Sequence, residues 1–98
     1  AAGADVLFAP ALPDLAAVRA VCSAVTKPVN VIAGSPGRFF TVAQLSAAGV
    51  RRVSTGPSLH RAALAGFIEG AREIAGAGTF TYGDRVLTGT EVYQRMSL

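Results

Sequence analysis

Short apolar runs alternate along the chain with longer segments whose apolar residues recur every three or four positions. The three runs cover residues 5–9, 28–33 and 51–56, and their starts are evenly spaced. Each run is apolar on both alternating faces, as in parallel strands that are covered on both sides. A helix-period segment follows each run, and this order is typical of βαβ units. The pattern therefore predicts an α/β fold with three parallel strands.

Three helices are expected, over residues 14–25, from Thr41 onward, and over residues 58–75. Thr41 and Gln44 have the spacing of a capping box at the start of the second helix. One apolar face of each helix is expected to pack inward. These faces are, in order, Leu15, Val18, Cys22 and Val25; Val42, Leu45 and Ala48; and Leu59, Ala63, Leu64, Phe67, Ile68 and Ile74.

Three β/α units are too few to close a barrel, and an isolated three-stranded sheet leaves both edges open to pairing. The chain also opens without a start methionine. We therefore expect the carboxyl-terminal piece of a larger (β/α) enzyme. Residues 1–78 are assigned to the three units, and residues 79–98 to a tail with a short helix near residues 90–96. Gly66 and Gly70 predict a close approach to the third helix.

Composition narrows the class of protein. The chain is 51% hydrophobic and 15% charged, which indicates a folded core rather than disorder. The net charge of +3 comes from scattered basic residues, which argues against a nucleic-acid binder.

Cys22 is the single cysteine and has no internal disulfide partner. No apolar stretch approaches the roughly 20 residues of a membrane span, and no signal peptide is recognised, so a cytoplasmic location is expected. The leucine-rich repeat pattern is missing, which disfavours a solenoid.

In a closed (β/α) barrel the active site lies at the carboxyl ends of the strands. The corresponding loops here are residues 9–12, 34–38 and 54–58, and two of them are rich in glycine. Gly56 and Ser58 lead directly into the third helix, an arrangement suited to a phosphate site. The alternative is that these glycines only make tight turns.

Three side chains near these loops are candidates for chemistry. Alternation places Asn30, Ile32 and Gly34 on one face of the second strand, so Asn30 either hydrogen-bonds neighbouring strands or touches substrate. Ser54 has the same two interpretations. Arg61 lies one turn into the third helix, where its guanidinium could bind a carboxylate, or it is a solvated surface arginine. No cluster has metal-ligand spacing.

Residues 2–10, 27–34 and 49–56 resemble the last three strands of the isocitrate lyase/phosphoenolpyruvate mutase superfamily, and residues 78–82 resemble the stretch after its last barrel helix. The resemblance implies strands six to eight of a (β/α)8 TIM barrel that acts on carbon–carbon or carbon–phosphorus bonds of 2-oxo and hydroxy acids. It also implies Mg²⁺, with ligands in the missing N-terminal part. The catalytic cysteine of the lyases belongs to that part too, so Cys22 is not its equivalent.

The substrate-binding candidates are Arg61, Gly34 and Pro10, whose positions are carried over from the family, and Asn30, which comes from the strand pattern. Arg61 matches an arginine that binds substrate carboxylate in the methylisocitrate lyase branch. Pro10 stands where that branch has a glutamate, and Ile32 and Gly34 stand where it has an asparagine and a threonine. The resemblance therefore favours a divergent branch over enzymes of citrate-like substrates.

The main hypothesis is thus a fragment of a Mg²⁺-dependent lyase or mutase, inactive by itself, whose partner molecule is a small 2-oxo or hydroxy acid. The family further implies a homo-oligomer with an exchanged last helix. Two alternatives stay open at this point. One is a different phosphate-binding (β/α)8 enzyme, and the other is a non-catalytic half-barrel that acts in protein association.

Overall fold

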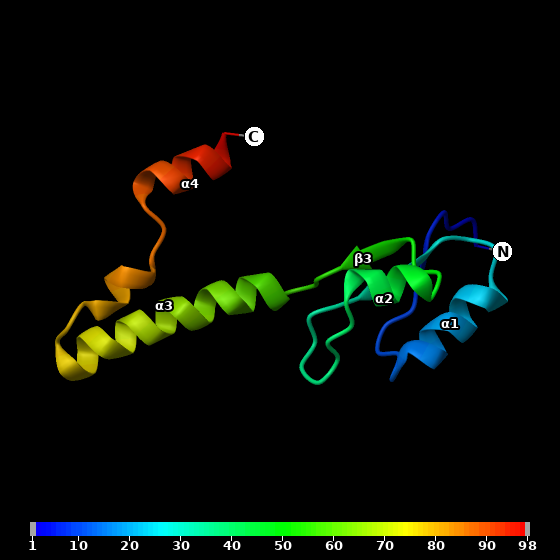
Figure 1. Cartoon of the computed structure of the whole chain (residues 1–98), viewed down its shortest axis with the longest axis horizontal. Coiled ribbons are helices and arrows are strands. Elements are labelled where there is room, and N and C mark those ends of the chain that lie inside the picture. Colours follow the sequence, from blue (N-terminus) through cyan, green and yellow to red (C-terminus); the bar gives the residue numbers. More distant parts are fainter. Residues whose placement is uncertain (1, 98) are drawn as a thin grey trace. The chain divides into compact units, whose positions relative to one another are not determined.

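The computed structural model describes residues 2–97. The chain divides into two compact units, with the boundary after Arg61. Their elements are labelled in Figure 1. The first unit contains β1 (Leu7–Phe8), α1 (Leu15–Ala24), β2 (Val29–Ile32), α2 (Val42–Ala47), β3 (Arg52–Ser54) and the start of α3 (Ser58–Ala77). The second contains the rest of α3, the 3-10 helix η1 (Thr81–Arg85) and α4 (Gly89–Met96).

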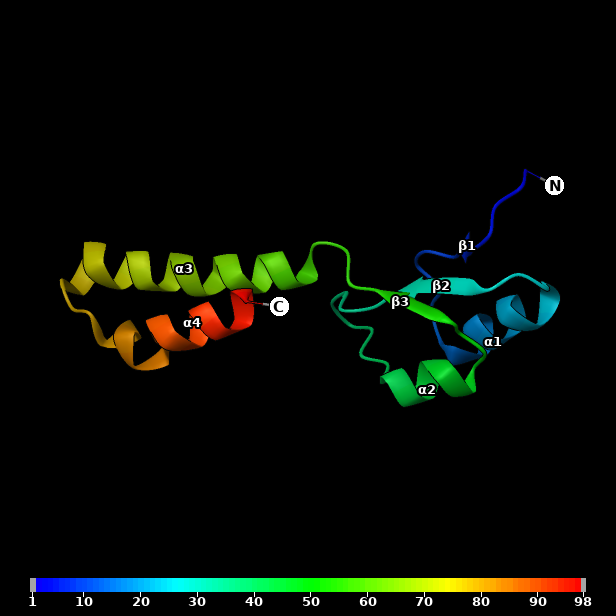
Figure 2. The same cartoon turned by 90° about the horizontal axis from the view of Figure 1, so that it is seen from above.

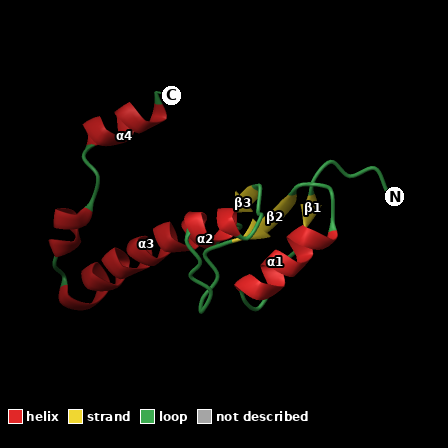
Figure 3. Ribbon diagram, turned by 45° about the vertical axis from the view of Figure 1, so that its right-hand side comes forward, coloured by secondary structure: helices red, strands yellow, loops and turns green. Residues whose placement is uncertain are grey.

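The strands form one parallel sheet in the order β1-β2-β3, as the sequence pattern predicts (Figure 3). Asn30 of β2 is paired with Phe8 of β1 and with Arg52 of β3. Each strand is shorter than the apolar run that contains it, because regular backbone pairing with the neighbouring strands covers only part of each run. The topology is that of a partial β/α barrel.

Helices α1 and α2 cover the same face of the sheet (Figure 2). Their buried side chains meet those of β2 in a single core formed by Val18, Val29, Val31, Leu45, Ala48 and Val50. Full burial of a valine or leucine side chain contributes about 1.5–3 kcal/mol, so this cluster is the main stabilising feature of the first unit. Leu15, Cys22 and Val25 pack at its margin, on the α1 face expected for them.

The helix starts follow the sequence signals closely. Asp14 caps α1 by accepting a hydrogen bond from the Ala17 amide at 2.8 Å. At α2 the predicted capping box is present: the Gln44 amide donates to Thr41 Oγ1 at 3.1 Å, and the Thr41 amide donates to Gln44 Oε1 at 2.9 Å. Reciprocal bonds of this kind satisfy amides that have no partner within the helix.

Burial predicted from helical periodicity is wrong at several positions. Val42, expected in the buried stripe of α2, is 73% exposed, whereas Leu45 and Ala48 are buried as expected. The predicted inward face of α3 is exposed throughout: Leu59, Ala63, Leu64, Phe67, Ile68 and Ile74. An apolar stripe is buried only where another surface covers it, and residues 2–97 do not supply such a surface.

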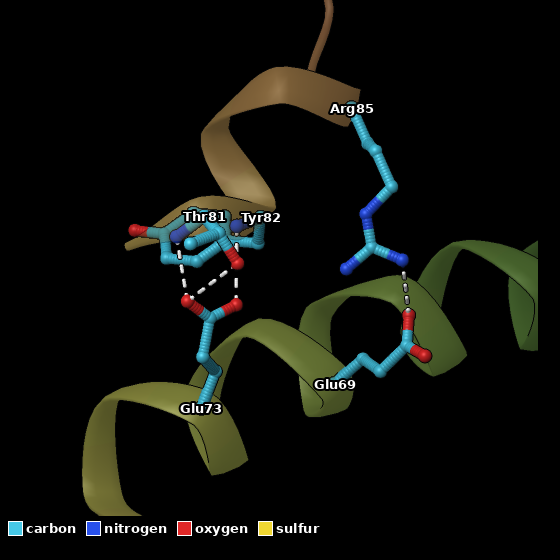
Figure 4. A network of polar contacts seen from close by, with 5 residues as sticks. All are labelled: Glu69, Glu73, Thr81, Tyr82 and Arg85. Carbon is cyan, nitrogen blue, oxygen red and sulfur yellow. Dashed lines mark hydrogen bonds and ion pairs between the residues drawn. The ribbon is translucent and has the colours of Figure 1, made fainter. Parts of the chain in front are cut away.

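In the second unit, the chain after α3 is held by one carboxylate (Figure 4). Glu73 accepts hydrogen bonds from the hydroxyls of Thr79 and Thr81 and from the amides of Thr81 and Tyr82. The bond from the Thr79 hydroxyl, together with those from Thr81 and Tyr82, lowers the pKa of Glu73. Glu73 thus fixes the start of η1, and the polar residues of the 78–82 stretch have a structural role.

The two glycines of α3 have different surroundings. A Cβ on Gly70 would lie 3.2 Å from the Tyr82 ring, whereas a Cβ on Gly66 would meet no atom within 4 Å. The predicted close approach therefore occurs at Gly70, and Tyr82 of η1 makes it. At Gly66 the prediction finds no counterpart in the described residues. No helix among residues 2–97 combines the length and the hydropathy that crossing a membrane requires.

Candidate functional site

A pocket of about 190 Å³ lies at the carboxyl ends of β2 and β3, beside the first turn of α3. The loop after β2 contributes Gly34, Ser35 and Pro36, and the loop after β3 contributes Thr55, Pro57 and Ser58. Ile32 and Arg61 complete the lining. This is the end of the sheet at which parallel β/α folds place their ligands.

The two loops approach closely because Gly34 has no side chain. Its φ is +80°, and an added Cβ would lie 2.6 Å from Ser58 Oγ. Both the left-handed backbone and the lack of space therefore require glycine at this position. Just before it, the Ala33 amide donates to the Ser54 carbonyl at 2.8 Å, so backbone pairing extends to the edge of the pocket.

The turn into α3 fixes the other wall. The amide and the hydroxyl of Ser58 both donate to the Thr55 carbonyl, at 3.1 and 2.8 Å. Gly56 within this turn has a φ of +52°, and a Cβ there would lie 2.7 Å from Ile32 Cδ1. The Arg61 amide donates to the Pro57 carbonyl at 2.9 Å, which places Arg61 in the first turn of the helix. Arg61 consequently reaches the pocket from a hydrogen-bonded helical backbone.

Asn30 lies beneath these loops rather than in the pocket lining. The residue is 4% exposed, and its Nδ2 donates to Ser54 Oγ at 3.0 Å. This bond links β2 to β3, which is one of the two roles that the sequence left open for Asn30. The Oδ1 atom is buried and has no hydrogen-bond partner among the described residues. Contact between Asn30 and substrate stays a prediction.

The comparisons with known proteins identify the family. The family model of phosphoenolpyruvate phosphomutase matches residues 1–75, most of the chain. This chain belongs to the phosphoenolpyruvate mutase family, within the isocitrate lyase/phosphoenolpyruvate mutase superfamily that the sequence resembles. Among proteins of curated function, none matches it significantly.

A solved structure gives further support. The crystal structure of a protein provisionally assigned as a lyase/mutase, from Burkholderia cenocepacia J2315, matches with a TM-score of 0.87 and 41% sequence identity. The match covers 98% of this chain and 35% of that protein. The phosphoenolpyruvate mutase family chain described here therefore spans about a third of the length of that structure.

Only some of the positions carried over from the family line the pocket. Arg61 and Gly34 both line the pocket, although they are far apart in the sequence. Pro10 is exposed in the loop after β1 and is not part of the lining. Ser35 and Thr55 do line it, and the sequence gave no separate reason to select them. Their only signal was membership of the two glycine-rich loops at the strand ends.

The described residues do not form a site for Mg²⁺. Nowhere in residues 2–97 do three His, Cys, Asp or Glu side chains come together as metal ligands do. Mg²⁺ prefers carboxylate, phosphate and water oxygens, and the pocket beside Arg61 is not lined by a carboxylate. What this pocket offers is one cation, small polar groups and apolar walls.

Proposed function

We propose that this chain forms the carboxyl-terminal substrate-binding wall of a lyase or mutase that acts on 2-oxo or hydroxy acids. Family membership supports a lyase or mutase parent. The single observation that carries the proposal is the position of Arg61, which lines a pocket at the carboxyl ends of β2 and β3. Sites of (β/α) enzymes are built at this end of the sheet.

In this proposal Arg61 binds the carboxylate of the substrate. A guanidinium presents paired N–H donors that match the two oxygens of a carboxylate, and such charge-assisted bonds orient the bound acid. The first amides of α3 lie at the positive end of the helix dipole and add to the preference for an anion. Together these groups would hold one end of the substrate while bond cleavage or formation takes place at the other.

Metal chemistry belongs elsewhere in the proposed enzyme. The residues described here do not fit Mg²⁺, so its ligands are expected from the remainder of the barrel. No step at Arg61 depends on the metal. By the same argument, we expect the 98-residue chain by itself to be inactive.

We also propose that the parent enzyme is a homo-oligomer that exchanges its last helix. The support is an apolar hollow of about 440 Å³ on the second unit, whose lining includes Phe67, Ile74, Tyr82 and Val86. Exposed apolar surface of this kind marks association sites. Analytical ultracentrifugation of the full-length protein tests this proposal. Phe67→Glu should form a smaller assembly than the wild type. If the wild type and the variant are both monomers, the proposal is contradicted.

The substrate role of Arg61 is tested on the full-length protein with assays of carbon–carbon and carbon–phosphorus bond cleavage. Arg61→Gln should lower kcat/KM by about 10- to 150-fold, since a hydrogen bond to a charged group contributes about 1.5–3 kcal/mol and the pocket lining contains no second cation. Arg61→Lys should restore part of the loss. Arg72→Gln is the matched control, because Arg72 lies in the same helix outside this pocket. Equal activity of the Arg61 and Arg72 variants would refute the role.

A further inference from the structure

Ser54, the last residue of β3, is held to β2 and the residue after it by both its side chain and its backbone. Its Oγ accepts a hydrogen bond from Asn30 Nδ2 at 3.0 Å, and its carbonyl accepts one from the Ala33 amide at 2.8 Å. Because Asn30 is 4% exposed, little water competes for the first of these bonds, and such bonds are stronger than exposed ones. The end of β3 is therefore fixed relative to β2 at the residue before the turn into α3.

Short-range hydrogen bonds connect Ser54 to Arg61. Thr55 follows Ser54 directly, and its carbonyl accepts hydrogen bonds from the amide and the hydroxyl of Ser58, at 3.1 and 2.8 Å. The Pro57 carbonyl accepts a hydrogen bond from the Arg61 amide at 2.9 Å. Pro57 also has a fixed φ, which removes one of the rotations by which the turn could adapt. A displacement of Ser54 is consequently passed to the first turn of α3.

The turn has little room to absorb such a displacement. A Cβ on Gly56 would lie 2.7 Å from Ile32 Cδ1, and a Cβ on Gly34 would lie 2.6 Å from Ser58 Oγ. The turn therefore packs directly against β2 and the loop that follows it. Since the first compact unit extends to Arg61, each of these contacts joins two residues of that unit.

The orientation of the first turn of α3 matters for an arginine in particular. A guanidinium binds a carboxylate through two parallel N–H···O bonds, and both form only when its planar fork faces the two oxygens. A lysine ammonium is a compact charge on a flexible stem, and it tolerates a change in the direction from which it approaches. Because Arg61 lines the pocket at the carboxyl ends of β2 and β3, its binding to an acid depends on how its backbone is placed.

We propose that Asn30 and Ser54 are positioning residues for Arg61. Their buried hydrogen bond fixes the end of β3, the turn carries this constraint to the first turn of α3, and the guanidinium is thereby aimed at the substrate carboxylate. The inference rests on the proposed function, in which Arg61 binds that carboxylate. It goes beyond that function in assigning a role in substrate binding to two residues that do not line the pocket of the described residues.

The test is a double-mutant cycle on the full-length protein, with pyruvate as the 2-oxo acid. Isothermal titration calorimetry in a buffer that contains Mg²⁺ gives the Kd of the wild type, Ser54→Ala, Arg61→Lys and the double variant. Ser54→Ala should weaken binding by about 2- to 10-fold, the range that corresponds to one typical hydrogen bond. In the Arg61→Lys background the same change should weaken binding by less than about twofold, because a flexible ammonium does not need the orientation.

Two further variants separate positioning from a general loss of stability. Ser54→Thr retains the hydroxyl group and should bind pyruvate nearly as tightly as the wild type does. Val18→Ala lowers stability through the core on the other face of the sheet, and it should leave the Kd within about twofold of the wild-type value. Thermal melts show whether each variant is folded at the temperature of the titration. Asn30→Leu removes the same hydrogen bond with a side chain of similar size, and it replaces Ser54→Ala in the cycle if that variant does not fold.

The outcomes distinguish this inference from the proposed function. A loss of binding in Ser54→Ala that largely disappears in the Arg61→Lys background supports the positioning role. If Ser54→Ala leaves binding unchanged, or weakens it equally in both backgrounds, the positioning role is overturned and the role of Arg61 stands. If the wild type does not bind pyruvate, or if Arg61→Gln binds it as tightly as the wild type, the proposed role of Arg61 is wrong and the positioning role falls with it.

Discussion

Asn30 donates a hydrogen bond from Nδ2 to Ser54 Oγ at 3.0 Å, and this bond joins β2 to β3 just before the two loops of the pocket begin. Both residues precede the segments that contribute Gly34 and Ser58. The bond therefore helps to set the distance between those loops. Because Asn30 is almost fully buried, an amide without this partner would be costly.

Ser54→Ala is expected to lower the free energy of unfolding by about 1–3 kcal/mol, the cost of leaving a buried donor unsatisfied. Urea denaturation followed by circular dichroism measures this. Ser23→Ala, at an exposed position of α1, is the matched control and should change stability by less than about 0.5 kcal/mol. Equal effects of the two substitutions would mean that the Asn30–Ser54 bond contributes nothing to stability.

Gly34 and Gly37 allow backbone strain to be separated from steric contact. Their φ values are +80° and +76°, but only a Cβ on Gly34 would contact another residue, Ser58. Gly37→Ala should destabilise by about 1–2 kcal/mol, the cost of a left-handed conformation in an alanine. Gly34→Ala should cost more, because Ser58 must also move. Denaturation midpoints of the two variants test this, and a smaller loss for Gly34→Ala would contradict the close contact between the loops.

Gly66 and Gly70 provide a second matched pair, within α3. Each Gly→Ala change raises helix propensity by about 1 kcal/mol. Gly66→Ala should realise this gain, since a Cβ there meets no atom within 4 Å. Gly70→Ala should gain little or lose stability, because its Cβ would press on the Tyr82 ring at 3.2 Å. Thermal melts of both variants decide the matter. An equal gain at both positions would show that Tyr82 does not pack against Gly70.

The Glu73 carboxylate makes the second unit sensitive to acid. Hydrogen bonds, first that from Thr79, lower the pKa of Glu73 in the folded state. The stabilisation that the ionised Glu73 carboxylate contributes is therefore fully present above the ordinary glutamate pKa. It is lost as the pH falls through the lower pKa that Glu73 has in the folded state. The difference in the free energy of unfolding between wild type and Glu73→Gln should shrink as the pH falls from the ordinary glutamate pKa through the lower pKa of the folded state.

The control for that experiment is Glu69→Gln. Glu69 pairs with Arg85 at 3.2 Å, but both side chains are largely exposed, and such surface pairs contribute little. Glu91, whose pKa the Thr88 amide lowers, titrates in both proteins and cancels in the comparison. Hydrogen exchange at the Thr81 and Tyr82 amides gives a local readout. Exchange that does not increase in Glu73→Gln at neutral pH would contradict the proposed anchoring of η1.

Much of the fold was determined by the sequence alone, because its signals are local. The period of the apolar runs predicted the parallel strands, and the Thr41–Gln44 spacing predicted a capping box that is present. The glycine-rich loops and Arg61 were recognised from their order relative to the strands. Propensity, capping and turn chemistry act over a few residues and can be read without knowledge of packing.

Only the tertiary structure decided which surfaces meet. Helical periodicity predicted an apolar face on α3 but could not predict which surface would cover it, and that face is exposed. The contact of Gly34 with Ser58, the bond between Asn30 and Ser54, and the anchoring of η1 by Glu73 join residues whose spacing in the sequence carries no signal. Such contacts depend on how the strands and helices are placed in three dimensions, and that placement is set by the packing of the whole fold.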